Sequence, residues 1–507
     1  MNENLFLKIY PGTFAQVVEG LDSMLQRPYG CFEQAASTTY PNILVLDYLR
    51  ETGRSSPEVE MKARSFIQTG YQRLLSFEVE KGMGGFSLFG HPPASVWLTA
   101  YGLMEFSDMS RVVEIDPDLL RRTRNWLVSQ QKSDGPFEDD LKVGAYVAWA
   151  LAHQEQPTLT GHKCSPELAN ACQYLTKHLA EIKKDGYLTA LAACAAVKAL
   201  GAKDPLSADL LAHLKAIAVR KDGAAVIPTH SETLAWGRGE VASTEATALA
   251  AIAFLEGEGD TQLTEELLTS VVRGKDASGA WYSTQATILS LKALTLSLRS
   301  PQSRGPFSVE VSVGGQVAAT LKVDESQRDV VHFVGLKNFL HSGDNEVTLK
   351  VAGDAKPCFQ LVGNYCLPWA AQVQAEYAPT VTVDVKYDRT TITRGQAVGV
   401  AATVKNTSSS VARMVMVDVG VPPGFTPEHS SLDTLLRKQI INRYEVTGRQ
   451  IIFYLPDMAP ATQIEINFDV RAKYLICAKS GQASAWPYYE PHKAFVAQPT
   501  LVTVTEK

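Results

Sequence analysis

The residue types best suited to chemistry lie near the start of the chain, in the segment Pro28-Tyr29-Gly30-Cys31-Phe32-Glu33-Gln34. The Cys31 thiol precedes the Gln34 carboxamide by three residues, and an apolar helical run follows from Thr39 to Leu49. A thiol at a helix N-terminus feels the partial positive charge there, which favours the thiolate. A thiolate beside a glutamine side chain can displace its ammonia. This spacing therefore predicts an internal Cys31–Gln34 thioester, an acylating group that reacts once.

The other cysteines indicate no metal centre. The seven cysteines, at positions 31, 164, 172, 194, 358, 366 and 477, show neither C-x-x-C nor Cys/His ligand spacing. Cys358 and Cys366 flank one predicted turn and can pair in an oxidising compartment, whereas Cys194 is interpreted as helix core. The plainer interpretation of Cys31 is likewise a small buried core residue. The choice between this interpretation and a thioester depends on the motifs in the rest of the chain.

Composition and charge narrow the class of protein. The 507 residues are 45% hydrophobic and 20% charged, which is ordinary for a globular protein of roughly three domains. A net charge of -6 provides no basic surface for nucleic acid and no polybasic membrane anchor. The longest apolar runs, such as Ala246–Leu255, are too short to cross a bilayer. No signal-peptide pattern precedes Leu5.

The elements that must position the thiol and the carboxamide change character near residue 300. Before it, apolar residues recur at helical spacing, as in Leu188, Leu191 and Ala195. After it they alternate along half-buried strands, as in residues 381–387. Residues 300–306 have the composition of a linker, and a second seam near 367–379 divides the β half.

The helical half also repeats itself. Short glycine-containing segments precede the helical runs at Gly85-Phe86, Asp134–Phe137, Asp185–Tyr187, Asp222-Gly223 and Ser278–Gln285. Their spacing of roughly 40–55 residues suits a pair of helices, and about six hairpins that close on themselves predict an α/α toroid. Each inner helix is expected to begin at a tight glycine turn with a Ser or Thr cap. Cys31 and Gln34 would then lie at one end of the toroid.

Taken together, these motifs resemble the C-terminal part of an alpha-2-macroglobulin, in the superfamily that includes complement components three and four, with the bacterial branch as the nearer match. The motifs are residues 28–34, Ser95–Tyr101, Asp134–Phe137, Ser283–Gln285 and Trp486–Pro491. The resemblance implies a multidomain protein, α and then β. Its parts would be an N-terminal CUB-like strand segment at 1–19, a thioester α/α toroid at 20–298, a CUB-like β module at 305–370 and a macroglobulin-like receptor-binding β-sandwich at 375–507.

The same resemblance implies a broad-spectrum protease inhibitor that traps its targets covalently. Cys31 would be the leaving thiol and Gln34 the acyl donor, and the partners would be proteases or other proteins with surface amines. This is single-use tagging rather than enzymatic turnover, and it needs no cofactor and no metal. The family further implies a periplasmic or extracellular location and association with preceding macroglobulin domains, so we expect the chain to be a fragment or a natural short form.

Two departures from the family bear on the chemistry. Phe32 stands where animal members carry glycine, although bacterial members also carry a large apolar residue there. Glu138, Asp139 and Asp140 run almost directly into the next helix, without the histidine loop that attacks the thioester in many complement proteins. We therefore expect direct reaction with amines in preference to hydroxyls. His91 is the substitute histidine, but we interpret it as a solvated loop residue.

An intact thioester must exclude water, because water hydrolyses it. Candidates for its cover are Tyr29, Phe32, Trp486, Tyr488 and Tyr489, although the plainer expectation for the last three is sandwich core. Backbone N–H groups at the start of the helix are expected to hold the developing oxyanion. Glu33 is interpreted as a local hydrogen-bonding residue.

Residues 431–438 form a predicted amphipathic helix in the last domain, and we expect it to pack onto the sandwich. Animal macroglobulins carry receptor-binding lysines in the matching segment. Asp433 stands where one of those lysines is expected, which argues against receptor binding of that kind.

Two other classes of function compete with the thioester. A toroid-fold enzyme, such as a prenyltransferase or terpene cyclase, needs a zinc site or an acidic metal cluster, and residues 138–140 are the only acidic run of that type. A non-covalent binding module with an inert Cys31 needs no special chemistry. A cysteine protease is a weaker alternative, because no histidine has a motif that places it beside Cys31.

Overall fold

The computed structural model describes residues 4–12, 15, 30–52, 57–155, 164–257, 259–276, 280–281, 283–298, 306–328, 330–353, 357–364, 378–488, 490 and 493–506. The chain divides into two compact units, residues 1–370 and 371–507. The first unit contains the helical half and a β module, and the second is a β-sandwich. The expected order, α and then β, is confirmed.

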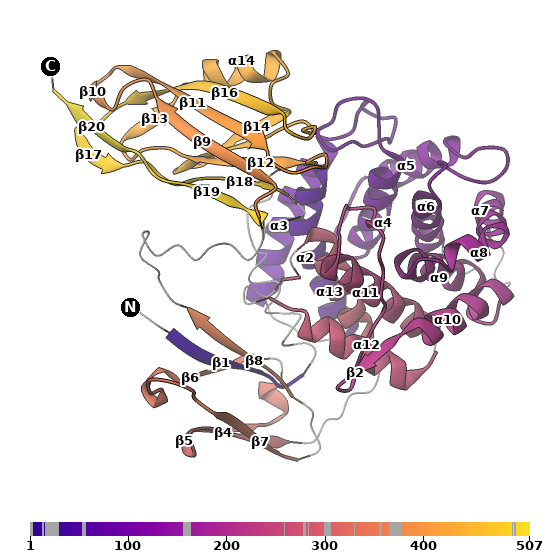
Figure 1. The fold of residues 1–507 in the computed structure, drawn as a ribbon. Helices are drawn as coiled ribbons and strands as arrows, with labels where there is room; N and C mark the ends of the chain where they lie inside the picture. Colours follow the sequence, from indigo (N-terminus) through magenta and orange to yellow (C-terminus); the bar gives the residue numbers. More distant parts are fainter. Residues whose placement is uncertain are drawn as a thin grey trace. The chain divides into compact units, whose positions relative to one another are not determined.

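The toroid is a ring of inner helices, six of them among the described residues. They are α2 (Phe32–Thr52), α4 (Val96–Val112), α6 (Leu141–Gln154), α9 (Gly186–Leu200), α11 (Glu240–Glu256) and α13 (Thr284–Ser297). Each contacts the next, and α13 contacts α2, so the ring closes (Figure 1). The described side chains of the inner helices are buried on almost every face. This all-round burial explains why their sequences are apolar and Ala-rich rather than amphipathic.

The outer helices cover this ring with one apolar face each. They are α3 (Pro57–Leu75), α5 (Pro117–Ser129), α7 (Pro166–Lys177), α10 (Pro205–Ile217) and α12 (Thr261–Arg273), with the short α8 (Leu179–Ile182) between α7 and α9. In α5 only the residues of one stripe are buried, Leu119, Thr123 and Leu127. A stripe of this width is typical of a helix with one side in water.

Polar caps begin several inner helices, and they are Ser, as predicted, at two of these helices and Asp at two others. The side chains of Ser95, Asp140, Asp185 and Ser283 each accept a backbone N–H in the first turn of the helix that they precede. Such a bond satisfies one of the N–H groups that a helix start leaves unpaired.

The segment Asp185–Tyr187 opens α9, with Asp185 as its cap and Gly186 as its first residue. Another expected repeat segment was placed wrongly. Asp222 and Gly223 form the turn of a small hairpin, β2 (Val219–Lys221) and β3 (Ala224–Val226), well before α11. Both have φ above zero, and Asp-Gly is a favoured pair in two-residue hairpin turns. The spacing rule could not tell this turn from a helix entry.

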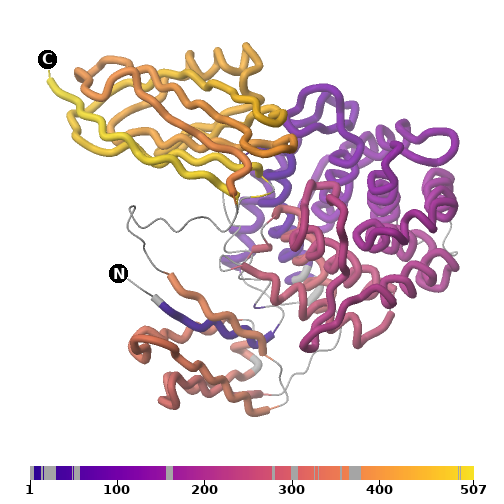
Figure 2. Tube along the Cα trace, in the orientation of Figure 1, coloured from indigo at the N-terminus to yellow at the C-terminus, as the bar shows by residue number. Residues whose placement is uncertain are grey.

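The β module packs two three-stranded sheets around a small core. One sheet has the order β6 (His332–Gly335), β1 (Asn4–Tyr10), β8 (Cys358–Asn364), and the other β5 (Gln316–Val323), β4 (Phe307–Val313), β7 (Val347–Ala352). Figure 2 shows the indigo β1 lying between strands from much later in the chain. Leu7, Ile9 and Val311 are buried in the shared core. The toroid is therefore an insertion between β1 and β4.

The second unit is a β-sandwich with its own hydrophobic core. Its larger sheets have the orders β13 (Phe425–Pro427), β16 (Gln463–Ala472), β11 (Ala397–Asn406), β9 (Val381–Tyr387) and β14 (Arg443–Val446), β15 (Gln450–Tyr454), β12 (Val415–Gly420), β18 (Ala483–Pro487), β19 (Phe495–Ala497). A third sheet joins β10 (Thr391–Thr393), β20 (Leu501–Thr505) and β17 (Ile476–Lys479). The predicted amphipathic helix is α14 (His429–Arg437), whose Leu432 and Leu435 are buried in this core. Its packing onto the sandwich is confirmed.

A search of the described helices finds none with both the length and the apolar character needed to cross a bilayer.

Candidate functional site

Cys31 and Gln34 meet at the first turn of α2. The Cys31 carbonyl accepts the first helical hydrogen bond, from the Ala35 N–H at 3.0 Å, so Cys31 is the capping residue and Gln34 is the third residue of the helix. The Gln34 side-chain oxygen Oε1 accepts from the Cys31 backbone N–H at 2.9 Å. This is one half of a capping box, in which the third residue reaches back to the cap. Helix capping thus holds the carboxamide against the residue that carries the thiol.

Gly30 makes this close approach possible. Its φ of +83° lies in the left-handed region, which glycine enters without the steric cost that other residues meet. A Cβ on residue 30 would lie 1.6 Å from Gln34 Oε1 and 2.5 Å from Gln34 Cδ. Glycine is therefore required at position 30 for two reasons: the turn needs a positive φ, and the Gln34 carboxamide occupies the space that a Cβ would fill.

The two reacting groups are buried. Cys31 is 0% exposed and Gln34 is 3% exposed. On the inner side, the Phe32 ring packs against Phe77 and Phe86, with ring centroids 6.1 and 5.5 Å away. Phe32 thus belongs to the toroid core. Its backbone N–H donates to the Leu88 carbonyl at 2.9 Å, so the N–H that holds the Gln34 oxygen is that of Cys31.

A second pair of contacts links the first inner helix to the last two. Thr284 Oγ1 donates to Glu33 Oε1 at 2.7 Å, and Ser283 Oγ donates to Glu245 Oε1 at 3.4 Å. Both carboxylates are buried, Glu33 at 0% and Glu245 at 1% exposure. Burial, with a smaller contribution from the nearby Glu33, raises the pKa of Glu245 to about 8 against the hydrogen bonds that lower it. Glu33 is a hydrogen-bonding residue, as predicted, but its partner Thr284 is distant in sequence rather than local.

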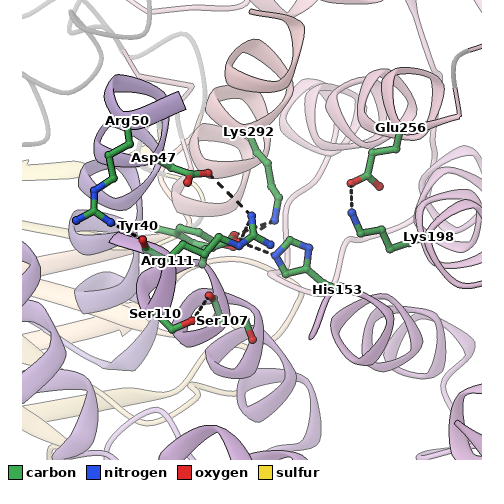
Figure 3. Close-up of polar contacts among 11 residues, drawn as sticks. Tyr40, Asp47, Arg50, Ser107, Ser110, Arg111, His153, Lys198, Glu256 and Lys292 are labelled. Carbon is green, nitrogen blue, oxygen red and sulfur yellow. Dashed lines mark hydrogen bonds and ion pairs between the residues drawn. The ribbon is translucent and has the colours of Figure 1, made fainter. Parts of the chain in front are cut away.

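The inner helices carry another buried polar cluster around Asp108 of α4. Figure 3 shows three of its members, Tyr40, His153 and Lys292, pointing toward one another. Asp108 accepts from Tyr40 Oη at 2.6 Å and contacts His153 Nε2 at 2.5 Å and Lys292 Nζ at 3.3 Å. Burial opposes ionisation of Asp108, but His153 and Lys292 outweigh it and hold its pKa well below the usual range. Because Tyr40 lies on α2 and Lys292 on α13, this cluster also joins the two ends of the ring. We therefore assign it a structural role.

The residues that a toroid-fold enzyme or a complement-type histidine would require do not form a common site. Asp140 caps α6 and Asp139 pairs with Lys132. Across the described part of the chain, no group of three or more His, Cys, Asp or Glu side chains could hold a metal ion. His91 is exposed, as expected of a solvated loop residue. Cys194 is fully buried in α9, as predicted.

One expectation for the last domain was wrong. In β12, Val415, Val417 and Val419 belong to the sandwich core, and in β18 Ala483 and Ala485 do. Trp486 lies opposite Met416 in the sheet and so points to the other face, because successive side chains alternate. Trp486 is therefore not sandwich core. Tyr29, Tyr489 and Cys366 lie outside the described residues.

Sequence reasoning missed two functional contacts of the segment. Arg73 of α3 donates from Nη2 to the Gly30 carbonyl at 2.9 Å, and no pattern in the sequence points to a residue 42 positions after Cys31. The contact between Thr284 and Glu33 joins residues 251 positions apart. Its only signal was the motif Ser283-Thr284-Gln285, which predicted a helix start but not its partner.

Comparison with known proteins agrees with this architecture. Residues 7–296 match the model of the A-macroglobulin TED domain, and residues 410–499 match that of the A-macroglobulin receptor binding domain. Ovostatin of Gallus gallus is 25% identical over an alignment that covers 95% of this chain and 34% of ovostatin. This chain thus spans about a third of that relative's length.

Solved structures show the same fold. Alpha-2-macroglobulin of Salmonella reacted with methylamine superposes with a TM-score of 0.66 at 18% identity, covering 99% of this chain and 32% of that one. Native alpha-2-macroglobulin of Escherichia coli, in a structure from domain MG7 to the C-terminus, gives 0.67 at 17% identity and covers 99% of this chain and 77% of that one. The matches to both domain models, with the capped Cys31–Gln34 turn inside the first, show that the chain belongs to the alpha-macroglobulin family and has the domains of the C-terminal part of an alpha-2-macroglobulin.

Proposed function

We propose that this chain carries an internal thioester between Cys31 Sγ and Gln34 Cδ, and that it uses this bond once to acylate amines of a target protease. The observation that carries the proposal is the hydrogen bond from the Cys31 N–H to Gln34 Oε1 at 2.9 Å, in a turn that is almost inaccessible to solvent. That contact brings the thiol-bearing residue and the acyl carbon together before any bond forms.

Formation of the bond follows from the same geometry. The Cys31 thiolate attacks Gln34 Cδ, and negative charge develops on Oε1, which the Cys31 N–H already holds. The C–N bond then breaks, and the nitrogen takes up a proton and leaves as ammonia. An N–H aimed at an oxygen where charge develops is the usual way in which acyl transfer is stabilised. Helix capping therefore supplies both proximity and an oxyanion donor.

Acylation of a target reverses the roles. A neutral amine, such as a lysine side chain, attacks Gln34 Cδ and the same oxygen carries the charge. The C–S bond breaks, the nitrogen loses a proton, and the Cys31 sulfur takes one up to become a thiol. The product is an amide between Gln34 and the target. Because the thioester is consumed, the protein acts as a covalent inhibitor and not as an enzyme.

Exclusion of water must last until a target arrives, since hydrolysis would convert Gln34 to Glu. Phe32 and its aromatic neighbours close the inner side of the turn. We propose that aromatic residues supply the outer cover, for which Trp486 and Tyr488 are the candidates that the sequence suggests in the last domain. Tyr29 and Tyr489 remain candidates for the same cover.

The wider setting follows from the family. We propose that the chain works with preceding macroglobulin domains, in the periplasm or outside the cell, against proteases of more than one specificity. The fold match to a methylamine-reacted relative supports methylamine as the first small amine to try. At 34% of the length of ovostatin, this chain contains the acylating part of such an inhibitor.

The test is covalent capture of a protease. Trypsin would be incubated with the chain and with Cys31→Ser, and the products separated on a denaturing reducing gel. We expect a higher-mass conjugate only with the unsubstituted chain, and none after pretreatment with methylamine. A conjugate that persists in Cys31→Ser would contradict the mechanism. Binding without any conjugate, from a chain that releases no thiol with methylamine, would favour the module with an inert Cys31.

A further inference from the structure

Arg73 of α3 contacts the acyl-transfer turn through its guanidinium group. We propose that Arg73 is a positioning and polarising residue, which strengthens the Cys31 N–H as the hydrogen-bond donor to the Gln34 oxygen. This inference rests on the proposed thioester and adds a residue that controls how fast the thioester forms and reacts.

The argument begins with one peptide group. Its carbonyl belongs to Gly30 and accepts from Arg73 Nη2 at 2.9 Å. Its N–H belongs to Cys31 and donates to Gln34 Oε1 at 2.9 Å. The guanidinium, the Gly30–Cys31 peptide and the carboxamide oxygen therefore form a continuous chain of hydrogen bonds, which begins at a permanent positive charge and ends at the oxygen that carries the developing negative charge.

A charged donor on a peptide carbonyl draws electron density from nitrogen to oxygen, which makes the N–H of the same peptide a better donor. Hydrogen bonds to ionised groups are roughly twice as strong as neutral ones. Chains of hydrogen bonds strengthen each other by roughly 10–30% per bond, most effectively where water is excluded. Gln34 Oε1 is neutral in the ground state and negative in the tetrahedral intermediate. The strengthened donor therefore favours the transition state over the ground state, as catalysis requires.

The packing of α3 against α2 holds Arg73 in register with this turn. A Cβ on Gly70 would lie 1.8 Å from Thr39 Oγ1, so the two helices approach as closely as a glycine allows. Thr39 Oγ1 is itself fixed by donating to the Ala35 carbonyl at 2.7 Å. One turn after Gly70, the Arg73 guanidinium lies over the Phe77 ring, 5.8 Å from its centre. A charge held from two sides in this way is oriented before the reaction begins.

The experiment compares Arg73→Met, Arg73→Lys and a matched control, Arg64→Met. Arg64 lies on the same helix and also donates to a backbone carbonyl, that of Val112 at 3.2 Å, but away from the turn. Thioester content is measured first, from intact mass and thiol release. The rate of methylamine uptake and the infrared carbonyl band of the thioester, labelled with ¹³C at glutamine, are then measured on each variant. The band reports the strength of the hydrogen bond to the carbonyl, which a merely structural role would not change.

We expect Arg73→Met to take up methylamine roughly two- to eightfold more slowly, the share of an oxyanion donor that polarisation supplies. We also expect its carbonyl band to shift to higher frequency. Arg73→Lys, which keeps the charge, should recover most of the uptake rate and most of the carbonyl band position. Arg64→Met should match the unsubstituted chain in both. A folded Arg73→Met that never forms the thioester, with Arg73→Lys forming it, also supports the proposal, because formation passes through the same oxyanion.

Two results would overturn the proposal while leaving the proposed function intact. One is an Arg73→Met variant with the rate and the band of the unsubstituted chain. The other is loss of the thioester, or the same slowing, in Arg73→Lys and Arg73→Met alike, because that would assign to Arg73 a shape that lysine cannot replace. Absence of the thioester from the unsubstituted chain would instead remove the proposed function itself.

Discussion

Gly30→Ala is the substitution whose effect the structure defines most sharply. The added Cβ would lie 1.6 Å from Gln34 Oε1, and real Cβ atoms essentially never approach closer than 3.0 Å, so the carboxamide must retreat by about 1.4 Å. Misplacing a reacting group by ~1 Å costs about 10²-fold in rate. The left-handed φ adds roughly 1–2 kcal/mol of strain to alanine, partly offset by ~0.4–1 kcal/mol from a less flexible unfolded chain. The retreat also breaks the hydrogen bond from the Cys31 N–H to Gln34 Oε1, and a buried donor left unsatisfied costs about 1–3 kcal/mol. Thioester formation should therefore fall at least a hundredfold, while stability falls by about 1–5 kcal/mol.

Thioester content and the stability of the fold are measured separately. Intact mass and methylamine-released thiol measure the bond, and a thermal melt measures stability. Gly82→Ala is the matched control, because Gly82 has φ +85° and a methyl group added there would meet nothing within 4 Å. We expect Gly82→Ala to keep the thioester and most of the stability, and Gly30→Ala to lose the thioester while still unfolding cooperatively at a lower temperature. A Gly30→Ala chain with a full thioester would refute the reasoning that this turn places the carboxamide.

Three further predictions concern the neighbourhood of the turn. Thr284→Val removes a hydrogen-bond donor to the buried Glu33 side chain and should lower the free energy of unfolding, measured by denaturant titration, by about 1–3 kcal/mol. Thr284→Ser keeps the hydroxyl and should retain most of the stability. Equal stabilities of the Thr284→Val and unsubstituted chains would show that the contact is dispensable. The pKa of Glu245 is raised by burial from 4.5 to about 8, so the native state holds an extra proton between those values and loses about 1.4 kcal/mol of stability per pH unit as pH rises through that window. Glu245→Gln should flatten this slope, and parallel curves for the two proteins would contradict the assignment. His91→Ala should leave the uptake of methylamine and of glycerol unchanged, since His91 is exposed; a selective loss of glycerol transfer would identify it as a nucleophile.

Local pattern was enough to predict much of the fold. Apolar residues at helical spacing predicted the inner helices, and the structure shows that these helices are buried on almost every side. Ser283 and Asp140 show that short polar residues before such runs are helix caps. Alternation predicted the strands of the sandwich. The same local reasoning misplaced the Asp222-Gly223 turn, since a glycine can begin a helix or turn a hairpin and the difference depends on the packing of the residues after it.

The site was predictable only where it is local in sequence. Cys31 and Gln34 are three residues apart, and helix geometry alone brings the third residue back to the cap. Arg73 and Thr284 contact the first turn of α2 through the packing of α3 and α13, and Glu245 of α11 contacts Ser283 beside them; no sequence spacing encodes these contacts. Trp486 was assigned to the wrong face of its sheet because its run of residues did not fix which alternate side chains point inward.

The most direct test of the account is the intact mass of the freshly purified chain, before and after methylamine, with a thiol count and a peptide map of residues 28–50. The account predicts a starting mass lower than that of the sequence by one ammonia. Methylamine should then add to Gln34 and release one new thiol at Cys31. A starting mass equal to that of the sequence, with Gln34 intact and Cys31 titrating as a thiol before any amine is added, would contradict it.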